Sequence, residues 1–160
     1  MFFDHVDRHK GEAPENPSHF QGQVKIQRFR DQFPGGVEII AVHFEAGGRT
    51  RPHSHSAGQV LHVTSGKGIV ATRSGRRFIE PGDIVIVTPG EWHWHGGTTS
   101  SAVTHVAMQL AGSTKWEEPE LNWAHLNGLQ HGPTQGKVEA NVLSNGGPYA
   151  ARYSWTSVLE

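Results

Sequence analysis

The sequence predicts a single all-β domain, and three features of the chain lead to this fold class. Short apolar runs recur about every eight to twelve residues, with no helical pattern between them. The 20 glycines and 9 prolines fall between these runs rather than in one tract, which is typical of turns that join short strands. A chain of 160 residues is long enough to bury one core. A sandwich or barrel is therefore expected rather than an α/β arrangement.

Composition excludes several classes of partner and site. The formal net charge is -1 and no block of like charge occurs, so neither nucleic acid nor an anionic membrane is an expected partner. The chain has no cysteine, which excludes disulfides and thiolate metal ligands. Its first twenty residues lack a basic region followed by an apolar run. We therefore expect a cytoplasmic protein without a membrane span.

The chain divides into three expected parts. Residues 1–20 are polar and form an N-terminal arm, whose Phe2 and Phe3 are expected to pack on another surface. Residues 21–112 form the barrel. Within it, alternation over residues 39–44 predicts a strand with one face toward a cavity and the other outward. Residues 113–160 form an extension of uncertain structure, with a short helical turn predicted within residues 115–123.

Later strands complete the predicted barrel. Residues 83–87 indicate a buried strand, and His62 is expected to face away from the interior. Residues 101–110 close the barrel with His105 and Gln109 on the inner face. Because Val106, Met108 and Leu110 make the outer face apolar as well, we expect this face to meet a second sheet or a second subunit, giving a homodimer. Beyond residue 112, Trp116, Trp123 and Trp155 are predicted anchors, whereas His125 and His131 are not expected to bind metal.

Two segments carry candidate metal ligands. Side chains alternate faces along a strand, so His53 and His55 point the same way and can hold one ion. Gln59 and His93 complete three imidazoles and one amide oxygen. Such donors suit divalent manganese, iron, cobalt or nickel, and histidines alone also suit zinc. Because all four groups are neutral, the ion would keep its full charge, which favours Lewis-acid chemistry. The alternative is that these histidines only satisfy a polar barrel interior.

Two further histidines have candidate catalytic roles. His95 is two residues beyond His93, so it is either a ligand or a proton carrier beside the ion. His105 lies on the inward face of its strand, where a free imidazole can act as a general base. The alternative for His105 is a core histidine bonded to a backbone carbonyl. Arg49, Arg51 and Glu91 are candidates for the rim of the site, unless they are simply solvated.

The spacing of these residues resembles the two motifs of the cupins. The first motif runs from Gly47 through His53, His55 and Gln59 to Gly66, and the second from Gly82 through Gly90 to His93. The resemblance covers residues 37–110 and implies a double-stranded β-helix, or jelly-roll barrel. The chain departs from the family pattern at three positions, with Gln59 for the usual glutamate, Thr88 for a proline and Gly97 for a frequent asparagine.

The wider pattern from Gly47 to Gln109 resembles the small bacterial manganese cupins with hydroxynitrile lyase activity. The resemblance implies Mn²⁺, held by His53, His55, Gln59 and His93, and His105 as the base. It also implies a substrate pocket lined by five residues: Ile40, Val42, Phe44, Thr50 and Gln109. The implied reaction is reversible cleavage of a cyanohydrin to an aldehyde and cyanide, with cyanide leaving toward His95. Two alternatives remain open, an Fe²⁺- or manganese-dependent dioxygenase and a small-molecule-binding cupin without catalysis.

Overall fold

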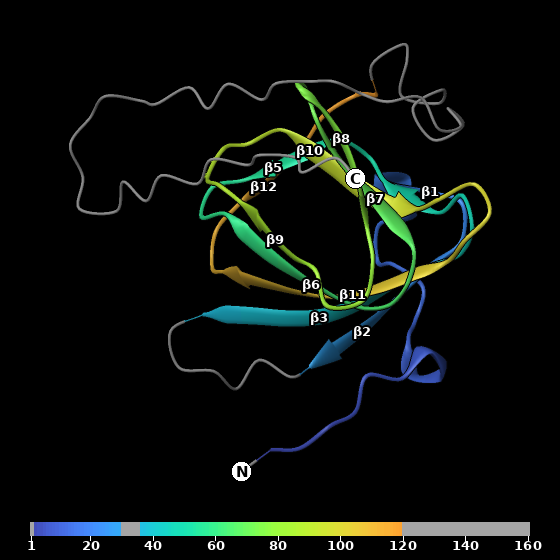
Figure 1. The fold of residues 1–160 in the computed structure, drawn as a ribbon. Coiled ribbons are helices and arrows are strands. Elements are labelled where there is room, and N and C mark those ends of the chain that lie inside the picture. The colour runs from blue at the N-terminus through green and yellow to red at the C-terminus, as the bar shows by residue number, and fades with distance from the viewer. Residues whose placement is uncertain (1, 30–35, 120–160) are drawn as a thin grey trace.

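Two antiparallel sheets face each other and enclose the interior of the molecule (Figure 1). The computed structural model describes residues 2–29 and 36–119. Among these residues the regular structure is almost entirely strand, as the sequence predicts. The elements in chain order are η1 (Arg8–Lys10), η2 (Pro17–His19), β1 (Phe20–Gln21), β2 (Val24–Phe29), β3 (Val37–Phe44), β4 (Arg49–Thr50), β5 (His53–His55), β6 (Gln59–Gly66), β7 (Gly68–Thr72), β8 (Gly75–Ile79), β9 (Ile84–Val87), β10 (His93–Gly97), β11 (Val103–Leu110) and β12 (Thr114–Trp116).

One sheet has the strand order β2-β3-β11-β6-β9. Its side chains alternate between the two faces, because successive residues of a strand point to opposite sides. The register places His105 opposite Val42 on β3 and opposite Val63 on β6. Val42, Val63 and Val103 belong to an apolar core that also includes Phe44. This core fixes which face of each strand points inward, and with it the position of every polar group on that face.

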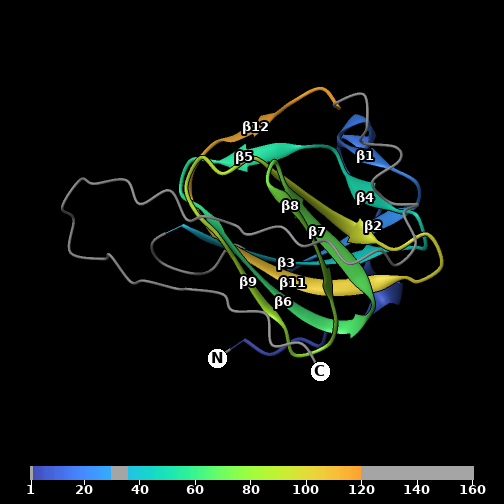
Figure 2. The same ribbon diagram turned by 45° about the horizontal axis from the view of Figure 1, so that its top comes forward.

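The other sheet is organised around β10. β7 pairs with one edge of β10, while β4 and β5 pair with the other edge. β1 then adds to β4 and β12 to β5, as Figure 2 shows for β12 along β5. All five residues of β10 are buried. A Cβ on Gly96 would lie 2.3 Å from the carbonyl oxygen of Gly48. The backbone of β10 approaches the backbone at Gly48 so closely that position 96 requires glycine.

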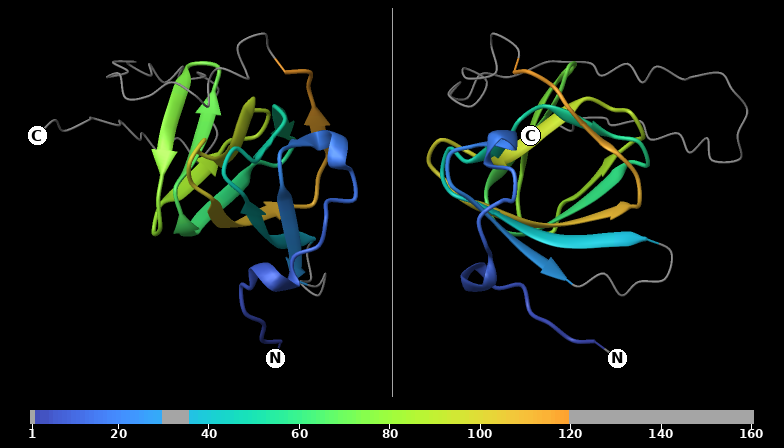
Figure 3. Two further views of the ribbon diagram at one scale, coloured as in Figure 1. Left: turned by 90° about the vertical axis from the view of Figure 1, so that its right-hand side faces the viewer. Right: turned by 180° about the vertical axis from the view of Figure 1, so that it is seen from behind.

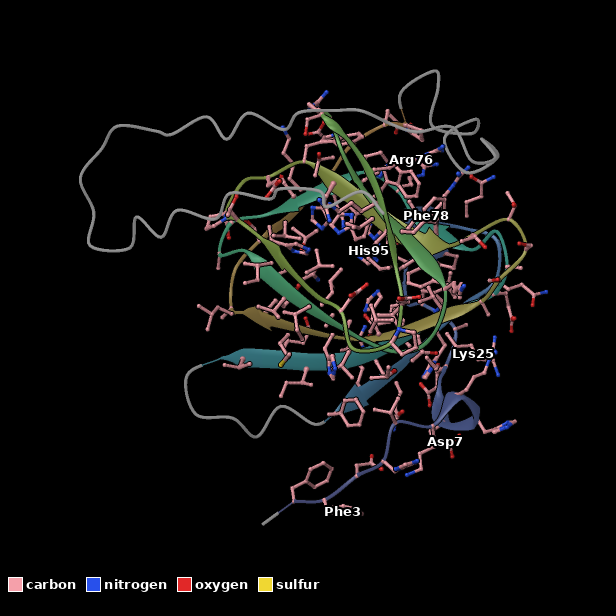
Figure 4. The ribbon with its side chains drawn as sticks, viewed as in Figure 1. Phe3, Asp7, Lys25, Arg76, Phe78 and His95 are labelled. Atoms are coloured by element: carbon pink, nitrogen blue, oxygen red, sulfur yellow. The ribbon has the colours of Figure 1, made fainter. Side chains whose placement is uncertain are left out.

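The N-terminal segment covers the outer face of β2 and β3 (Figure 3). The backbone N–H of Asp7 donates to Gln27 Oε1, and Gln27 Nε2 donates to the carbonyl oxygen of His5. His43, which was expected to pack outward, is consequently only 2% exposed. Phe2 and Phe3, which were expected to pack on another surface, do not pack on the described part of this chain, since they are 60% and 87% exposed. Figure 4 shows Phe3 pointing away from the barrel.

The outer face of β9 and β11 is apolar and partly exposed. The sequence predicted a buried strand over residues 83–87, but Ile84 and Ile86 of β9 are 51% and 65% exposed. Leu110 on the central strand β11 is 57% exposed, because its side chain points away from the interior, as those of Ile84 and Ile86 do on the edge strand β9. The homodimer stays a prediction. Light scattering should give about twice the chain mass of 17.5 kDa, and a monomer mass at working concentration would contradict it.

β12 differs from the predicted short helical turn. Lys115 and Trp116 are part of an extended strand, which pairs with β5 in a register that places Trp116 opposite His53. The sheet therefore includes residues beyond position 112.

Trp123, Trp155, His125 and His131 lie outside the described residues, as does the rest of the extension from 120. Within the described part of the chain, no helix has the length and apolar character needed to cross a membrane.

Candidate metal centre

Three buried imidazoles converge between β5 and β10. His53 and His55 lie on the same face of β5, and His93 of β10 is the cross-strand partner of His53. One ring nitrogen from each of the three lies within 4.8 Å of the other two. The sequence-based grouping of these histidines is therefore confirmed as a spatial cluster. Its formation depends on the pairing of strands from two distant segments, which holds the rings against one another.

Each of these imidazoles uses its Nδ1 atom in a hydrogen bond. His53 Nδ1 lies 2.8 Å from the carbonyl oxygen of Arg51, and His93 Nδ1 lies 3.0 Å from that of Glu91. His55 Nδ1 lies 3.0 Å from Thr114 Oγ1. A carbonyl oxygen can only accept, so Nδ1 of His53 and His93 carries the proton and Nε2 keeps its lone pair. This arrangement is typical of metal-binding histidines.

The fourth predicted ligand, Gln59, lies at the start of β6 on the inner face. Its side chain is buried at 7% exposure, and its Oε1 atom has no hydrogen-bond partner among the described residues. The Nε2 atoms of His55 and His93 are likewise buried without a partner. Buried polar atoms normally have partners, so these unpartnered nitrogen and oxygen atoms are consistent with a bound cation. Three imidazole nitrogens and one amide oxygen fit a divalent ion of the manganese or iron type.

Burial keeps the histidines of the site neutral. It is the first cause that lowers the pKa of His93 to about 4, and it also lowers the pKa of His53 well below the ordinary histidine value. The neighbouring His93 adds to the effect on His53, because two positive imidazoles repel each other. The pKa of His55 is lowered as well, first by burial. Neutral imidazoles are the form that binds a metal.

Acid should destabilise the metal-free protein. Histidine in the unfolded chain has a pKa of about 6.5, whereas burial lowers the pKa of His105 to about 3 and that of His93 to about 4 in the fold. As the pH falls below about 6.5, these histidines bind protons in the unfolded chain but stay neutral in the folded chain. The free energy of unfolding therefore decreases until about pH 3 to 4, where they become protonated in the fold as well. Urea unfolding of chelator-treated protein at pH 7.5 and 5.5 measures this. A midpoint that does not change with pH would contradict the prediction.

His95 and His105 form a second pair of imidazoles deeper in the barrel. Nε2 of His105 lies 3.1 Å from Nδ1 of His95. Both side chains are buried, at 3% and 0% exposure. Burial lowers the pKa of each, that of His105 to about 3. His95 Nε2 and His105 Nδ1 have no partner among the described residues. The pair is thus neutral, with one ring nitrogen left for a proton or a ligand at either end.

A cavity of about 290 Å³ opens beside the imidazoles. Figure 4 shows His95 inside the barrel, between the two sheets. Ile40, Val42, Thr50 and Gln109, all predicted to line a pocket, are in its wall together with the candidate ligands His53, His55 and Gln59 and with His95. Phe44 is not part of the wall, since it is fully buried and packs its ring 5.7 Å from that of His95 and 5.6 Å from that of His105.

His105 itself is not part of the cavity wall. His95 is in the wall, and His105 is bonded to it. A proton that leaves a molecule in the cavity would therefore meet His95 first and could pass on to His105. The roles predicted for the two residues, a base and a proton carrier, are compatible with this order but stay predictions.

An aromatic stack covers one candidate ligand, His53. The ring of Trp116 lies 4.6 Å from that of His53, and the ring of His19 lies 4.1 Å from Trp116 on an interplanar angle of 12°. η2 and β12, which carry His19 and Trp116, thus lie side by side at the cavity (Figure 3). The sequence indicated that Trp116 was an anchor but not what it contacts. Trp116 is brought to His53 by the pairing of β12 with β5.

The predicted rim residues are placed differently from one another. Arg49 is buried at 2% exposure, where burial lowers its pKa to about 10 and its guanidinium donates to Gln21 Oε1. It is therefore part of the sheet rather than the rim. Arg51 pairs with the exposed Glu118. Glu91 accepts hydrogen bonds from the backbone and hydroxyl of Thr88. None of the three is in the cavity wall.

The barrel, its paired motif strands and the imidazole cluster together define a cupin. Residues 40–108 match the family model described as "Cupin domain", and the chain belongs to the cupin family. It is 44% identical over 92 residues to an (R)-mandelonitrile lyase from Granulicella tundricola, a match that covers 56% of this chain and 70% of the relative. The chain is thus a cupin that resembles hydroxynitrile lyases.

Solved structures support the same fold. A cupin-like protein from Thermotoga maritima has a TM-score of 0.69 at 27% identity, covering 78% of this chain and 97% of its own. The polyketide cyclase RemF from Streptomyces resistomycificus has a TM-score of 0.62 at 13% identity, covering 78% and 92%. At such low identity the second likeness shows the fold alone.

Proposed function

We propose that this protein is a metal-dependent hydroxynitrile lyase, which cleaves a cyanohydrin to an aldehyde or ketone and hydrogen cyanide. The observation that carries this proposal is that one small cavity borders both candidate metal ligands and His95, whose Nε2 atom has no partner among the described residues. The reaction needs these two elements side by side, because an oxygen must be stabilised while its proton is removed. The similarity to an (R)-mandelonitrile lyase supports the same reaction.

The cation would be held by His53, His55, His93 and Gln59. When bound, a divalent ion would supply positive charge that stabilises negative charge on the substrate oxygen. We propose manganese, with iron as the other candidate, since nitrogen and neutral oxygen donors suit both. None of these four donors carries a negative charge, so the protein would not neutralise the charge of the ion.

The His95–His105 pair would move the proton. The substrate hydroxyl gives its proton to the pair through His95, the C–O bond becomes a carbonyl, and the bond to the nitrile carbon breaks with its electron pair on cyanide. Cyanide then takes a proton from the imidazolium and leaves as hydrogen cyanide, so protons and charge balance. His105 would share the positive charge through its hydrogen bond to His95. Both imidazoles are neutral beforehand because burial lowers their pKa.

The cavity determines the size of substrate. Its volume of about 290 Å³ is just below the range of about 300–1,000 Å³ that is usual for ligand pockets. Ile40, Val42 and Ala107 give one side of the wall an apolar surface. An aryl or short alkyl group would occupy this side, with the hydroxyl and nitrile toward the histidines. Mandelonitrile has this arrangement of groups.

Cyanide release from mandelonitrile tests the proposal directly. Protein stripped with a chelator is expected to be inactive, and reloading with Mn²⁺ should restore release. The loaded protein's metal content is measured in parallel, so that inactivity cannot be confused with an empty site. No release from protein that holds stoichiometric metal would overturn the lyase proposal. Oxygen consumption by that sample would indicate a dioxygenase, and ligand uptake without turnover would indicate a binding protein.

A further inference from the structure

A row of polar side chains crosses the inner face of three neighbouring strands. Gln109 on β11 is the direct cross-strand partner of Glu38 on β3 and of Gln59 on β6. Facing residues on adjacent strands lie close enough for their side chains to interact. Glu38 is at the cavity wall and partly exposed, at 38% for its side chain, whereas Gln59 is buried among the imidazoles. The row thus connects a partly exposed carboxylate to the fourth candidate ligand.

The three side chains are joined by hydrogen bonds. Gln109 Nε2 donates to Glu38 Oε2 at 2.5 Å, and Gln59 Nε2 donates to Gln109 Oε1 at 3.2 Å. The other oxygen of Glu38 accepts from Arg28 Nη1 at 2.9 Å. The chain ends at Gln59 Oε1, which is buried and has no partner within the described residues.

The carboxylate determines the direction of this chain. A side-chain amide has a donor end and an acceptor end of nearly equal size, so packing alone does not select its orientation. An ionised carboxylate can only accept, so Gln109 must present its Nε2 to Glu38 and its Oε1 to Gln59. Gln59 must then present its own Nε2 to Gln109. Its Oε1 is consequently left facing the imidazoles.

We infer that Glu38 is a positioning residue that acts through Gln109 to aim the amide oxygen of Gln59 at the bound cation. This inference rests on the metal centre proposed above. Without the carboxylate, both amides can turn over, and the Gln59 amide would then present N–H groups to a cation. The hydrogen bonds also polarise the amide oxygen. A negative charge at the cavity wall thus orients a neutral ligand without being a ligand itself.

The first test compares Glu38→Gln with Glu45→Gln. Both variants lose one carboxylate from the same region of the chain, but Glu45 pairs with Arg8 and is not in the cavity wall. The dissociation constant for Mn²⁺ is measured from the electron paramagnetic resonance signal of the free ion. We expect Glu38→Gln to raise it about tenfold or more, in the range of about 10–100-fold seen when groups behind metal ligands are changed. Glu45→Gln should match the wild type within about twofold.

The second test separates orientation from simple charge attraction. In a Gln59→Glu background, two carboxylates flank Gln109, which can donate to only one of them while its Oε1 faces the other. Adding Glu38→Gln removes this conflict, because the new amide can donate to Gln109 Oε1 while Gln109 donates to position 59. The second substitution should therefore tighten Mn²⁺ binding in this background, although it weakens binding in the wild type. Attraction by the Glu38 charge alone predicts weaker binding in both backgrounds.

Thermal unfolding of the metal-free variants checks that each is folded. Equal dissociation constants for the wild type and Glu38→Gln, or weaker binding of the double variant than of Gln59→Glu, would overturn the role of Glu38 and leave the metal centre standing. Failure of the folded wild type to bind Mn²⁺ would instead remove the manganese centre itself, and the role of Glu38 with it.

Discussion

Replacing His53 by alanine is expected to abolish metal binding. His53 supplies one of three imidazole nitrogens that lie within 4.8 Å of one another, and its Nδ1 hydrogen bond to Arg51 fixes which nitrogen faces the site. Mutation of a group that hydrogen-bonds to a metal ligand lowers the affinity for the metal by about 10–100-fold. Loss of a ligand itself should therefore lower this affinity by more than about 100-fold. Metal content after Mn²⁺ loading and dialysis, determined by elemental mass spectrometry, measures the effect.

His62→Ala is the matched control for this change. His62 lies on β6 and is partly buried, but its side chain points away from Gln59 and the interior. This variant should hold as much metal as the wild type. If His53→Ala also retains a full equivalent of metal, the three imidazoles are not the ligands. The alternative that they only satisfy a polar barrel interior would then be the better account.

Replacing His105 by alanine should leave metal bound but reduce cyanide release from mandelonitrile by about a hundredfold or more. Proton transfer by a positioned side chain contributes about 10²–10⁴-fold to rates. His105 contacts His95 through a 3.1 Å hydrogen bond and is not in the cavity wall. The loss should therefore fall mainly on kcat rather than KM, which steady-state kinetics on metal-loaded protein can separate.

His43→Ala is a suitable control because His43 is almost as buried as His105. It lies on β3 at 2% exposure and is bonded to Thr104, and its Nε2 has no partner among the residues that the structure describes. Its ring is on the face of β3 covered by the N-terminal segment, on the far side of the strand from the cavity. If removal of any buried imidazole lowered kcat by disturbing the fold, both variants would show the loss. An unchanged kcat for His105→Ala would end its assignment to proton transfer.

The sequence was sufficient to predict the parts of the fold and site that depend on local periodicity. Alternation along a strand placed His53 and His55 on one face, and the same rule placed His105 and Gln109 on the inner face of β11. Both placements are confirmed, as is the all-β cupin fold. The cluster with His93 was also predicted, because the spacing of the two motifs resembles that of a family whose strands are known to pair.

The features that the sequence did not predict depend on pairing between distant strands. Nothing near Glu38 marks it as part of the site, since its role follows from its register opposite Gln109. Trp116 reaches His53 because β12 pairs with β5. The sequence offers Arg49 as a rim candidate or a solvated residue, but its strand lies between β1 and β10, which bury it. The exposure of Ile86 likewise depends on β9 being an edge strand of its sheet.

The stack of His19 on Trp116 on His53 has a practical consequence for defining the functional unit. Residues 40–108 match the family model, yet Asn16, His19, Glu38, Thr114 and Trp116 are all in the cavity wall. A protein trimmed to the matched span would lack the hydroxyl of Thr114 that bonds His55 and the indole that covers His53. The cavity would lose part of its wall, and the rings of His53 and His55 would each lose a contact that holds them in place. The boundaries given by family similarity are therefore narrower than the unit that builds the site.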